Sequence, residues 1–163
     1  MWKDVEKAAI SAVNDKKIIQ LQYGLVFSFE SGILFIKLPS GRRLAYYKAA
    51  VETDKRFNRP KLTYWGMDQV KKVWTKVDTY GGKLVENVIQ AIARDCLAEA
   101  LIRVDAAGYR IVSHGHDEIV TEVPIGQGSL EELNRIMGQP ISWAEGLPVP
   151  ADGFSGFYYK KDD

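Results

Sequence analysis

The sequence is poor in cysteine and histidine, and it contains no long run of apolar residues. Its one cysteine, Cys96, excludes an internal disulfide and suits a reducing cytoplasm. The two histidines, His114 and His116, are too few for a zinc site that needs three or more imidazoles. No stretch approaches the roughly 20 apolar residues of a membrane helix, and the N-terminus lacks a signal-peptide pattern. We therefore expect a cytoplasmic protein without membrane attachment.

The composition is that of a folded domain with a segregated charge. Hydrophobic residues make up 46% of the 163 residues, which is enough for a core. The net charge of +1 hides eleven basic and three acidic residues in 37–76, a balance of +8, and seven basic against fourteen acidic residues in 77–163, a balance of −7. A basic segment of this kind suits contact with a phosphate backbone, although an ordinary solvated surface explains it equally well.

The N-terminal half has the pattern of one helix followed by strands. An amphipathic helix is predicted for residues 4–14, and its apolar side comprises Val5, Ala8, Ala9, Ala12 and Val13. The period then shortens to two, which predicts an antiparallel meander with strands at residues 18–23, 25–29, 33–38 and 43–47. Residues 52–61 are polar and basic and predict a loop. Another short strand is expected at 62–67, followed by a partly helical stretch at 70–74.

The longest predicted element is a helix over residues 82–107. Apolar residues recur within it at spacings of three and four, and Gly108 follows as a helix-ending glycine. The opposite side carries a row of long polar side chains: Lys83, Asn87, Gln90 and Arg94. A solvated helix face explains most such rows; the alternative is a row directed at a nucleic-acid groove.

Next comes a hairpin-like run over residues 110–123, with His116, Asp117 and Glu118 at its tip. Side chains alternate along a strand, so neighbouring carboxylates converge only where the chain turns, and Gly115 supplies freedom for a tight turn. Two adjacent carboxylates repel unless a cation lies near them, and Mg²⁺ accepts carboxylate and phosphate oxygens together. Many solvated turns carry such residues without any chemistry, and that alternative stays open.

The C-terminal region completes the predicted architecture. Ser129-Leu-Glu-Glu132 is a capping box for a short helix that ends near Gly138, and residues 143–159 predict an extended, packed tail. Together these elements predict an α+β fold, in which the long helix packs across an antiparallel sheet that contains the 110–123 hairpin.

The order of motifs resembles a known enzyme family. A helix that begins TYGGKLVENVIQAIARD, a strand, HDE, and a strand that ends EVP resemble the C-terminal palm of family A (polymerase I-like) DNA polymerases, closest to the phage and prophage type. LPSGRRLAYY, LTYWGMDQ and GSLEELNRIM are also similar to that subgroup. The resemblance implies a palm segment over residues 80–163, preceded over 1–79 by a helix, the meander and the basic loop, in one compact unit.

The resemblance also implies roles for the residues of the hairpin tip. Asp117 matches a metal-binding aspartate. Glu118 matches the neighbouring carboxylate, which lies near the metal in a supporting role. His116 matches a histidine near the primer terminus. These would be the catalytic residues of template-dependent nucleotidyl transfer by a two-metal scheme, with Mg²⁺ or Mn²⁺ as the cofactor. Primer–template DNA and a deoxynucleoside triphosphate are the implied partners.

On the long helix, Gln90 matches a glutamine that reaches the minor groove beside the newly formed base pair. Lys83, Asn87 and Arg94 share its face and are the other DNA-binding residues that the resemblance suggests. Their match to the family is looser than that of Gln90.

The departures from the family are as informative as the matches. No DYSQIE-like motif supplies the second palm aspartate, and the fingers helix is absent. One carboxylate pair binds metal weakly, so the chain alone is predicted to be inactive. It resembles a split subunit, a prophage remnant or a truncated piece, and a second polypeptide carrying the missing motifs is an expected partner. The alternative is a non-catalytic DNA-binding or structural remnant.

A zinc hydrolase is the rival enzyme. His114-Gly-His116-Asp117 resembles the start of the metallo-β-lactamase pattern H-x-H-x-D-H. There the aspartate lies two residues after the second histidine, whereas here it follows directly, and no further histidine is present. The zinc alternative is therefore disfavoured.

Overall fold

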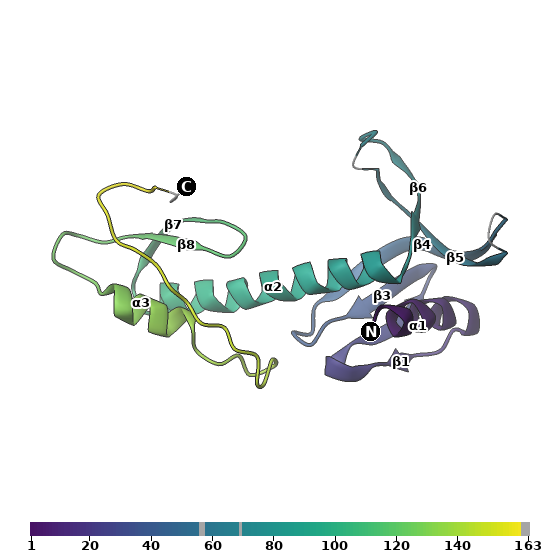
Figure 1. Ribbon diagram of the computed structural model, residues 1–163, viewed down its shortest axis with the longest axis horizontal. Coiled ribbons are helices and arrows are strands. Elements are labelled where there is room, and N and C mark those ends of the chain that lie inside the picture. Colours follow the sequence, from purple (N-terminus) through teal and green to yellow (C-terminus); the bar gives the residue numbers. More distant parts are fainter. Residues whose placement is uncertain (56–57, 69, 161–163) are drawn as a thin grey trace. The chain divides into compact units, whose positions relative to one another are not determined.

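The computed structural model describes residues 1–55, 58–68 and 70–160. The chain divides into a first unit, Met1–Ile92, and a second unit, Ala93–Asp163. The first contains α1 (Trp2–Asp15), β1 (Ile19–Gln20), a 3₁₀ turn η1 (Gln22–Gly24), β2 (Val26–Glu30), β3 (Ile33–Lys37), β4 (Arg43–Asp54), β5 (Arg59–Met67) and β6 (Trp74–Thr79). Helix α2 (Gly81–Ala106) begins in the first unit and ends in the second, which also contains β7 (Arg110–His114), β8 (Ile119–Glu122) and α3 (Leu130–Met137) (Figure 1).

The first unit is a six-stranded antiparallel meander in which every strand pairs with its neighbour in sequence. The predicted meander is confirmed, except that the first strand, expected at 18–23, covers only Ile19–Gln20 and gives way to the 3₁₀ turn. Helix α1 packs against the sheet (Figure 1), and all five apolar residues assigned to its inner side are buried. They join Phe27, Leu34, Ile36 and Leu62 in one core, because alternate residues of each strand face the same side.

Two predictions for the β4–β6 region are wrong. Residues 52–61 were expected to form a loop, but β4 continues to Asp54 and β5 begins at Arg59. The polar residues belong to a solvent-facing part of the sheet, where Glu52 pairs with Lys61 in register. Part of this stretch, residues 56–57, lies outside the described residues.

The helical stretch expected at 70–74 is a turn that leads into β6. The N–H of Lys72 donates to the carbonyl of Asp68 at 2.8 Å, and β6 starts at Trp74. Its alternation of exposed and half-buried residues (WTKVDT) was a strand signal that the short apolar cluster before it obscured. Gln69 lies outside the described residues.

Helix α2 confirms the prediction within one residue at either end. In the first unit its inner face contributes Leu84, Val88 and Ala91 to the core. At its C-terminus Gly108 has φ +87°, a left-handed conformation that glycine adopts without steric cost, and the N–H of Tyr109 donates to the carbonyl of Val104.

In the second unit, β7 and β8 form a two-stranded sheet of their own. The expectation that a larger sheet contains this hairpin is therefore wrong, although the hairpin itself and the α+β class are confirmed. The hairpin is held by side-chain packing rather than by further strand pairing. Val104, Tyr109 and Ile136 are buried together, with Ile111, Ile119, Leu133 and Met137 packed around them.

Half of the predicted capping box is confirmed, the Ser129 cap of α3. The Ser129 hydroxyl accepts from the N–H of Glu132 at 3.2 Å, and α3 ends before Gly138. The Glu132 carboxylate does not reach back to the cap directly, because the Tyr109 hydroxyl lies between them: it accepts from the N–H of Ser129 and donates to Glu132 at 2.7 Å. The tail, expected to be extended over 143–159, begins with turns at 142–146 and is extended beyond them. It is largely unpacked, and the Phe157 side chain is 95% exposed.

No helix in the described part of the chain combines the length and apolar character that a membrane crossing requires.

Candidate functional site

The three residues His116, Asp117 and Glu118 lie at the turn of the β7–β8 hairpin. His114 and Ile119 form the last strand pair, and the N–H of Gly115 donates to the carbonyl of Glu118 at 3.0 Å. His116 and Asp117 therefore occupy the two-residue tip. Both side chains are exposed, whereas Glu118 is half-buried.

Gly115 is needed for a different reason from the one the sequence suggested. Its backbone is not among the left-handed glycines, so the turn does not demand a positive φ there. A Cβ at this position would lie 2.8 Å from Oε1 and 2.9 Å from Cγ of Glu118. The absence of a side chain thus leaves room for Glu118 to fold back over the turn.

The two carboxylates of the turn have different surroundings. Asp117 makes no hydrogen bond or ion pair with the described residues, so its oxygens are open to an incoming ligand. One oxygen of Glu118 accepts a hydrogen bond from the Tyr159 hydroxyl at 2.8 Å. That bond to a carboxylate raises the pKa of Tyr159 above its ordinary value, because it favours the protonated phenol.

Tyr159 is a residue of this site that sequence reasoning missed. It lies 41 positions after Glu118, in the aromatic tail. Its neighbours Phe154, Phe157 and Tyr158 are similar in character, so the sequence offers no signal that singles it out.

The two carboxylates of the turn supply fewer oxygen ligands than a divalent cation requires. Asp117 and Glu118 are hard oxygen donors suited to Mg²⁺ or Mn²⁺, but Mg²⁺ prefers six oxygens in octahedral geometry. In the part of the chain that the structure describes, no three His, Cys, Asp or Glu side chains converge as metal ligands. These residues therefore do not fit a complete ion site, and donors from elsewhere would have to complete one.

The four polar residues predicted to form a row on α2 differ in their partners and in their exposure. The ammonium of Lys83 pairs with Glu86 at 3.0 Å, which raises the Lys83 pKa. Asn87 donates from Nδ2 to the hydroxyl of the buried Tyr46 at 3.0 Å, so its amide already serves the core of the first unit. Gln90 and Arg94 are exposed. Of these four residues, the first three belong to the first unit and Arg94 to the second.

One hollow of the second unit lies away from the carboxylates. It has a volume of about 580 Å³ and is lined by residues that include Tyr109, Arg110, Glu122 and Glu132. Arg110 and Glu122 pair at the end of the hairpin away from the tip, and an ion pair of 2.8 Å joins them. The geometry therefore presents Asp117 on an exposed turn rather than in an enclosed pocket.

No protein-family model matches the chain, and no solved structure matches it. The sequence is 58% identical to the DNA polymerase of Bacillus phage SP02 over 161 residues, which is 99% of this chain. The match covers 25% of that polymerase, so the chain spans about a quarter of its relative's length. The chain is therefore similar, along nearly its whole length, to a segment of a phage DNA polymerase.

Proposed function

We propose that the chain is a segment of a family A DNA polymerase that takes part in template-dependent nucleotidyl transfer during DNA replication. It would contribute the Asp117 carboxylate to a site that other parts of the enzyme complete. The observation that carries the proposal is the 58% identity to a phage DNA polymerase over nearly the whole chain, together with an exposed aspartate at the tip of the HDE hairpin.

The surroundings of the turn give each residue a distinct role in the proposal. Asp117, which has no partner among the described residues, would be the direct ligand of the cation that the polymerase resemblance implies, Mg²⁺ or Mn²⁺. Glu118 would support it, because Tyr159 already occupies one of its oxygens. His116 is exposed beside Asp117 and would face the primer terminus.

The proposal requires donors from outside this chain. A two-metal scheme needs a second carboxylate and the nucleotide's own phosphates, and the described residues bring no third ligand to the turn. Assembly with a polypeptide that carries the missing palm strand and fingers helix would create the site from two parts. Since convergent carboxylates repel, the divalent cation itself should favour that assembly.

A reconstitution experiment tests this proposal. The probe is the phage SP02 polymerase from which the segment matching this chain has been deleted, mixed with the purified chain, primer–template DNA, four nucleotides and Mg²⁺ or Mn²⁺. Primer extension is expected in the mixture and in neither protein alone. Asp117→Asn should abolish extension, and Glu118→Gln should reduce it less.

Glu145→Gln, which alters an exposed carboxylate outside the hairpin, is the matched control and should leave extension unchanged. Extension that survives Asp117→Asn would remove the aspartate from the mechanism. If the deleted polymerase binds this chain but no mixture extends a primer, the alternative of a non-catalytic DNA-binding or structural remnant is favoured.

The same function predicts weak, salt-sensitive binding of primer–template duplex through the exposed part of α2. Phosphate contacts release counterions, so the affinity should fall steeply from low to moderate salt. Gln90→Ala and Arg94→Ala should weaken duplex binding, because both side chains are exposed. Affinity that ignores salt would contradict a nucleic-acid role for this face. The structure gives Asn87 an internal partner, so among the four residues of the row we expect it to contribute least.

A further inference from the structure

One face of the β4–β6 sheet collects large aromatic side chains in solvent. Tyr47 pairs in register with Trp65, and Met67 pairs with Trp74, so all four side chains point to the same side of three neighbouring strands. We call Tyr47, Trp65, Met67 and Trp74 the aromatic face. They are 45%, 37%, 49% and 56% exposed, whereas the opposite face contributes Leu62 and Tyr64 to the core.

A β-bulge places a lysine on this face. The register of β4 and β5 shifts between Tyr47 and Ala50, so that Lys48 and Ala49 together oppose Tyr64. Lys48 has φ 48°, and the N–H of Ala49 donates to the carbonyl of Gly32 at 3.0 Å. In an unbroken strand Lys48 would share the core side with Tyr46. The bulge instead keeps Ala49 buried and leaves Lys48 exposed beside Tyr47.

The lysine lies against the rings. Its ammonium is 5.6 Å from the centroid of the Tyr47 ring and 5.4 Å from that of Trp65. The Tyr47 and Trp74 rings in turn approach each other, with centroids 6.3 Å apart and planes tilted by 48°. Among the described residues Lys48 has no carboxylate partner, so its charge remains available to an anion.

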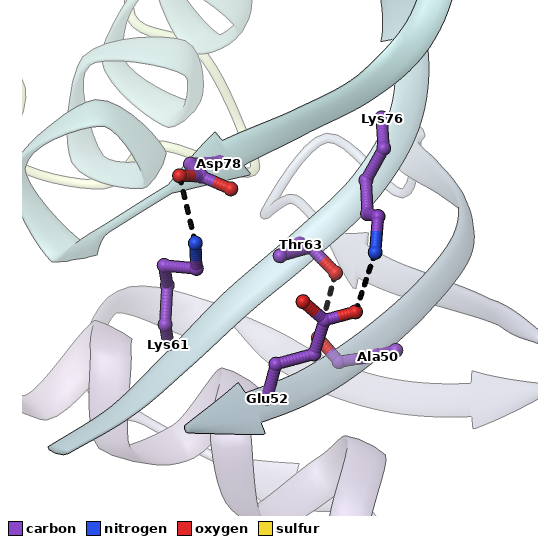
Figure 2. Close-up of polar contacts among 6 residues, drawn as sticks. All are labelled: Ala50, Glu52, Lys61, Thr63, Lys76 and Asp78. Carbon is purple, nitrogen blue, oxygen red and sulfur yellow. Dashed lines mark hydrogen bonds and ion pairs between the residues drawn. The ribbon is translucent and has the colours of Figure 1, made fainter. Parts of the chain in front are cut away.

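Two acidic groups on the same side of the sheet, Glu52 and Asp78, are already paired. Figure 2 shows Lys76 reaching Glu52 and Lys61 reaching Asp78, at 2.7 and 2.9 Å. The hydroxyl of Thr63 lies 3.4 Å from the carbonyl of Ala50 and ties β5 to the strand just beyond the bulge (Figure 2). Past the aromatic face, the turn between β5 and β6 adds the exposed Lys71 and Lys72.

We propose that the aromatic face with Lys48 is a stacking platform for the unpaired bases of single-stranded DNA. Exposed rings on which bases stack, with cations beside them for the phosphates, are the features by which proteins bind single strands without sequence preference. A protein partner would also cover apolar rings, but the unpaired lysine among them and the local excess of basic residues favour a polyanion. This inference rests on the nucleic-acid function proposed above and adds a second contact surface to it.

The test measures binding of a labelled thymidine oligomer of about 12 nucleotides, a length within known single-strand site sizes. Fluorescence anisotropy at low salt, without divalent cation or nucleotide, should show binding to the full chain. Trp74→Ala should weaken it about tenfold, the loss of one stacked base, and should leave duplex affinity within about twofold. Trp74→Phe, which keeps an aromatic ring, should restore most of the loss.

Trp2→Ala is the matched control, because Trp2 is 54% exposed on α1, away from the aromatic face. It should leave the affinity for the single strand unchanged. Lys48→Met should weaken binding and reduce its salt dependence. If Trp74→Ala lowers the affinities for single strand and duplex equally, the platform is overturned. It is also overturned if the chain forms dimers that Trp74→Ala dissociates.

The outcomes separate this inference from the polymerase proposal. Asp117→Asn should leave single-strand binding intact while abolishing reconstituted extension. If the mixture extends a primer but Trp74→Ala does not change the affinity for single-stranded DNA, the platform is overturned and the polymerase proposal is not. Aromatic-dependent single-strand binding without extension in any mixture would support the platform and count against the polymerase proposal.

Discussion

The two units of the chain are stabilised very differently. Among the described residues of the first unit, sixteen are buried in one cluster, to which α1, α2 and most strands of the sheet contribute. The cluster around the hairpin of the second unit has three buried residues, Val104, Tyr109 and Ile136. The strands of the second unit are short, and the tail of this unit is largely exposed.

This difference in packing affects how firmly each unit holds its candidate functional residues. A large core fixes the first unit and holds the bulge of β4 in place, whereas the candidate carboxylates belong to the sparsely packed second unit. Catalytic constellations need support from surrounding packing to hold their geometry. Under the polymerase proposal, the HDE hairpin is therefore expected to gain its final order on assembly with the partner polypeptide.

The largest effect is expected from a truncation in the first core. Phe27 is fully buried, so Phe27→Ala should lower the free energy of unfolding by about 3–5 kcal/mol, through lost burial and the cavity that remains. Urea unfolding followed by circular dichroism measures the change. Phe157→Ala, at a 95% exposed position, is the control and should stay within about 0.5 kcal/mol. Similar losses in both variants would show that the first core is not the main source of stability.

A truncation in the smaller cluster should have a lesser and more local effect. Ile136 is 5% exposed and packs with Val104 and Tyr109, so Ile136→Ala should cost about 2 kcal/mol. Amide hydrogen exchange should accelerate in β7 and β8 while the sheet of the first unit stays protected. If amide exchange accelerates uniformly across the chain, the two units unfold as one, and they do not differ in stability as argued above.

Periodicity predicted the regular parts of both units. The buried side of α1, the 26-residue α2 and the Ser129 cap of α3 each follow from local patterns, because burial of one face and satisfaction of helix ends are local requirements. Strand β6 and the continuation of β4 to Asp54 were missed. Their polar residues face solvent, and the side-chain pairs Lys61–Asp78 and Lys76–Glu52 join residues 17 and 24 positions apart.

The candidate site was predicted only in part. The position of His116 and Asp117 at a tip follows from the flanking strands, but the contact of Glu118 with Tyr159 depends on where the tail folds. The bulge at Lys48 had no local signal either, since it arises from the register between β4 and β5. Strand register and tail docking are therefore the features that local sequence patterns do not predict.

A third prediction concerns α2, where a polar residue of the predicted DNA-binding row serves the first core. Asn87→Ala would leave the hydroxyl of the buried Tyr46 without the bond from the Asn87 amide, at a cost of about 1–2 kcal/mol. Gln90→Ala is the matched control on the same helix and should stay within about 0.5 kcal/mol. Thermal unfolding of the two variants measures the difference. If Gln90→Ala destabilises the chain as much as Asn87→Ala does, the structural role assigned to Asn87 is wrong.

The smallest expected effect is a shifted titration in the second unit. The hydrogen bond to the Glu118 carboxylate raises the pKa of Tyr159 above its ordinary value near 10. Since the folded-state pKa is the higher one, the contribution of this contact to tail docking is complete below about pH 10 and is lost as pH rises through the pKa of Tyr159. Glu118→Gln removes the negative charge and should return the pKa toward 10, whereas Glu122→Gln, on the same strand pair but bonded to Arg110, should not. NMR titration of carbon-labelled tyrosine, with the Tyr159 signal assigned by Tyr159→Phe, measures the shift. An identical Tyr159 midpoint in the unchanged chain, Glu118→Gln and Glu122→Gln would mean that the tail does not dock on the HDE turn. The second unit would then hold its carboxylates with even fewer contacts, and the contrast with the well-packed first unit would be larger.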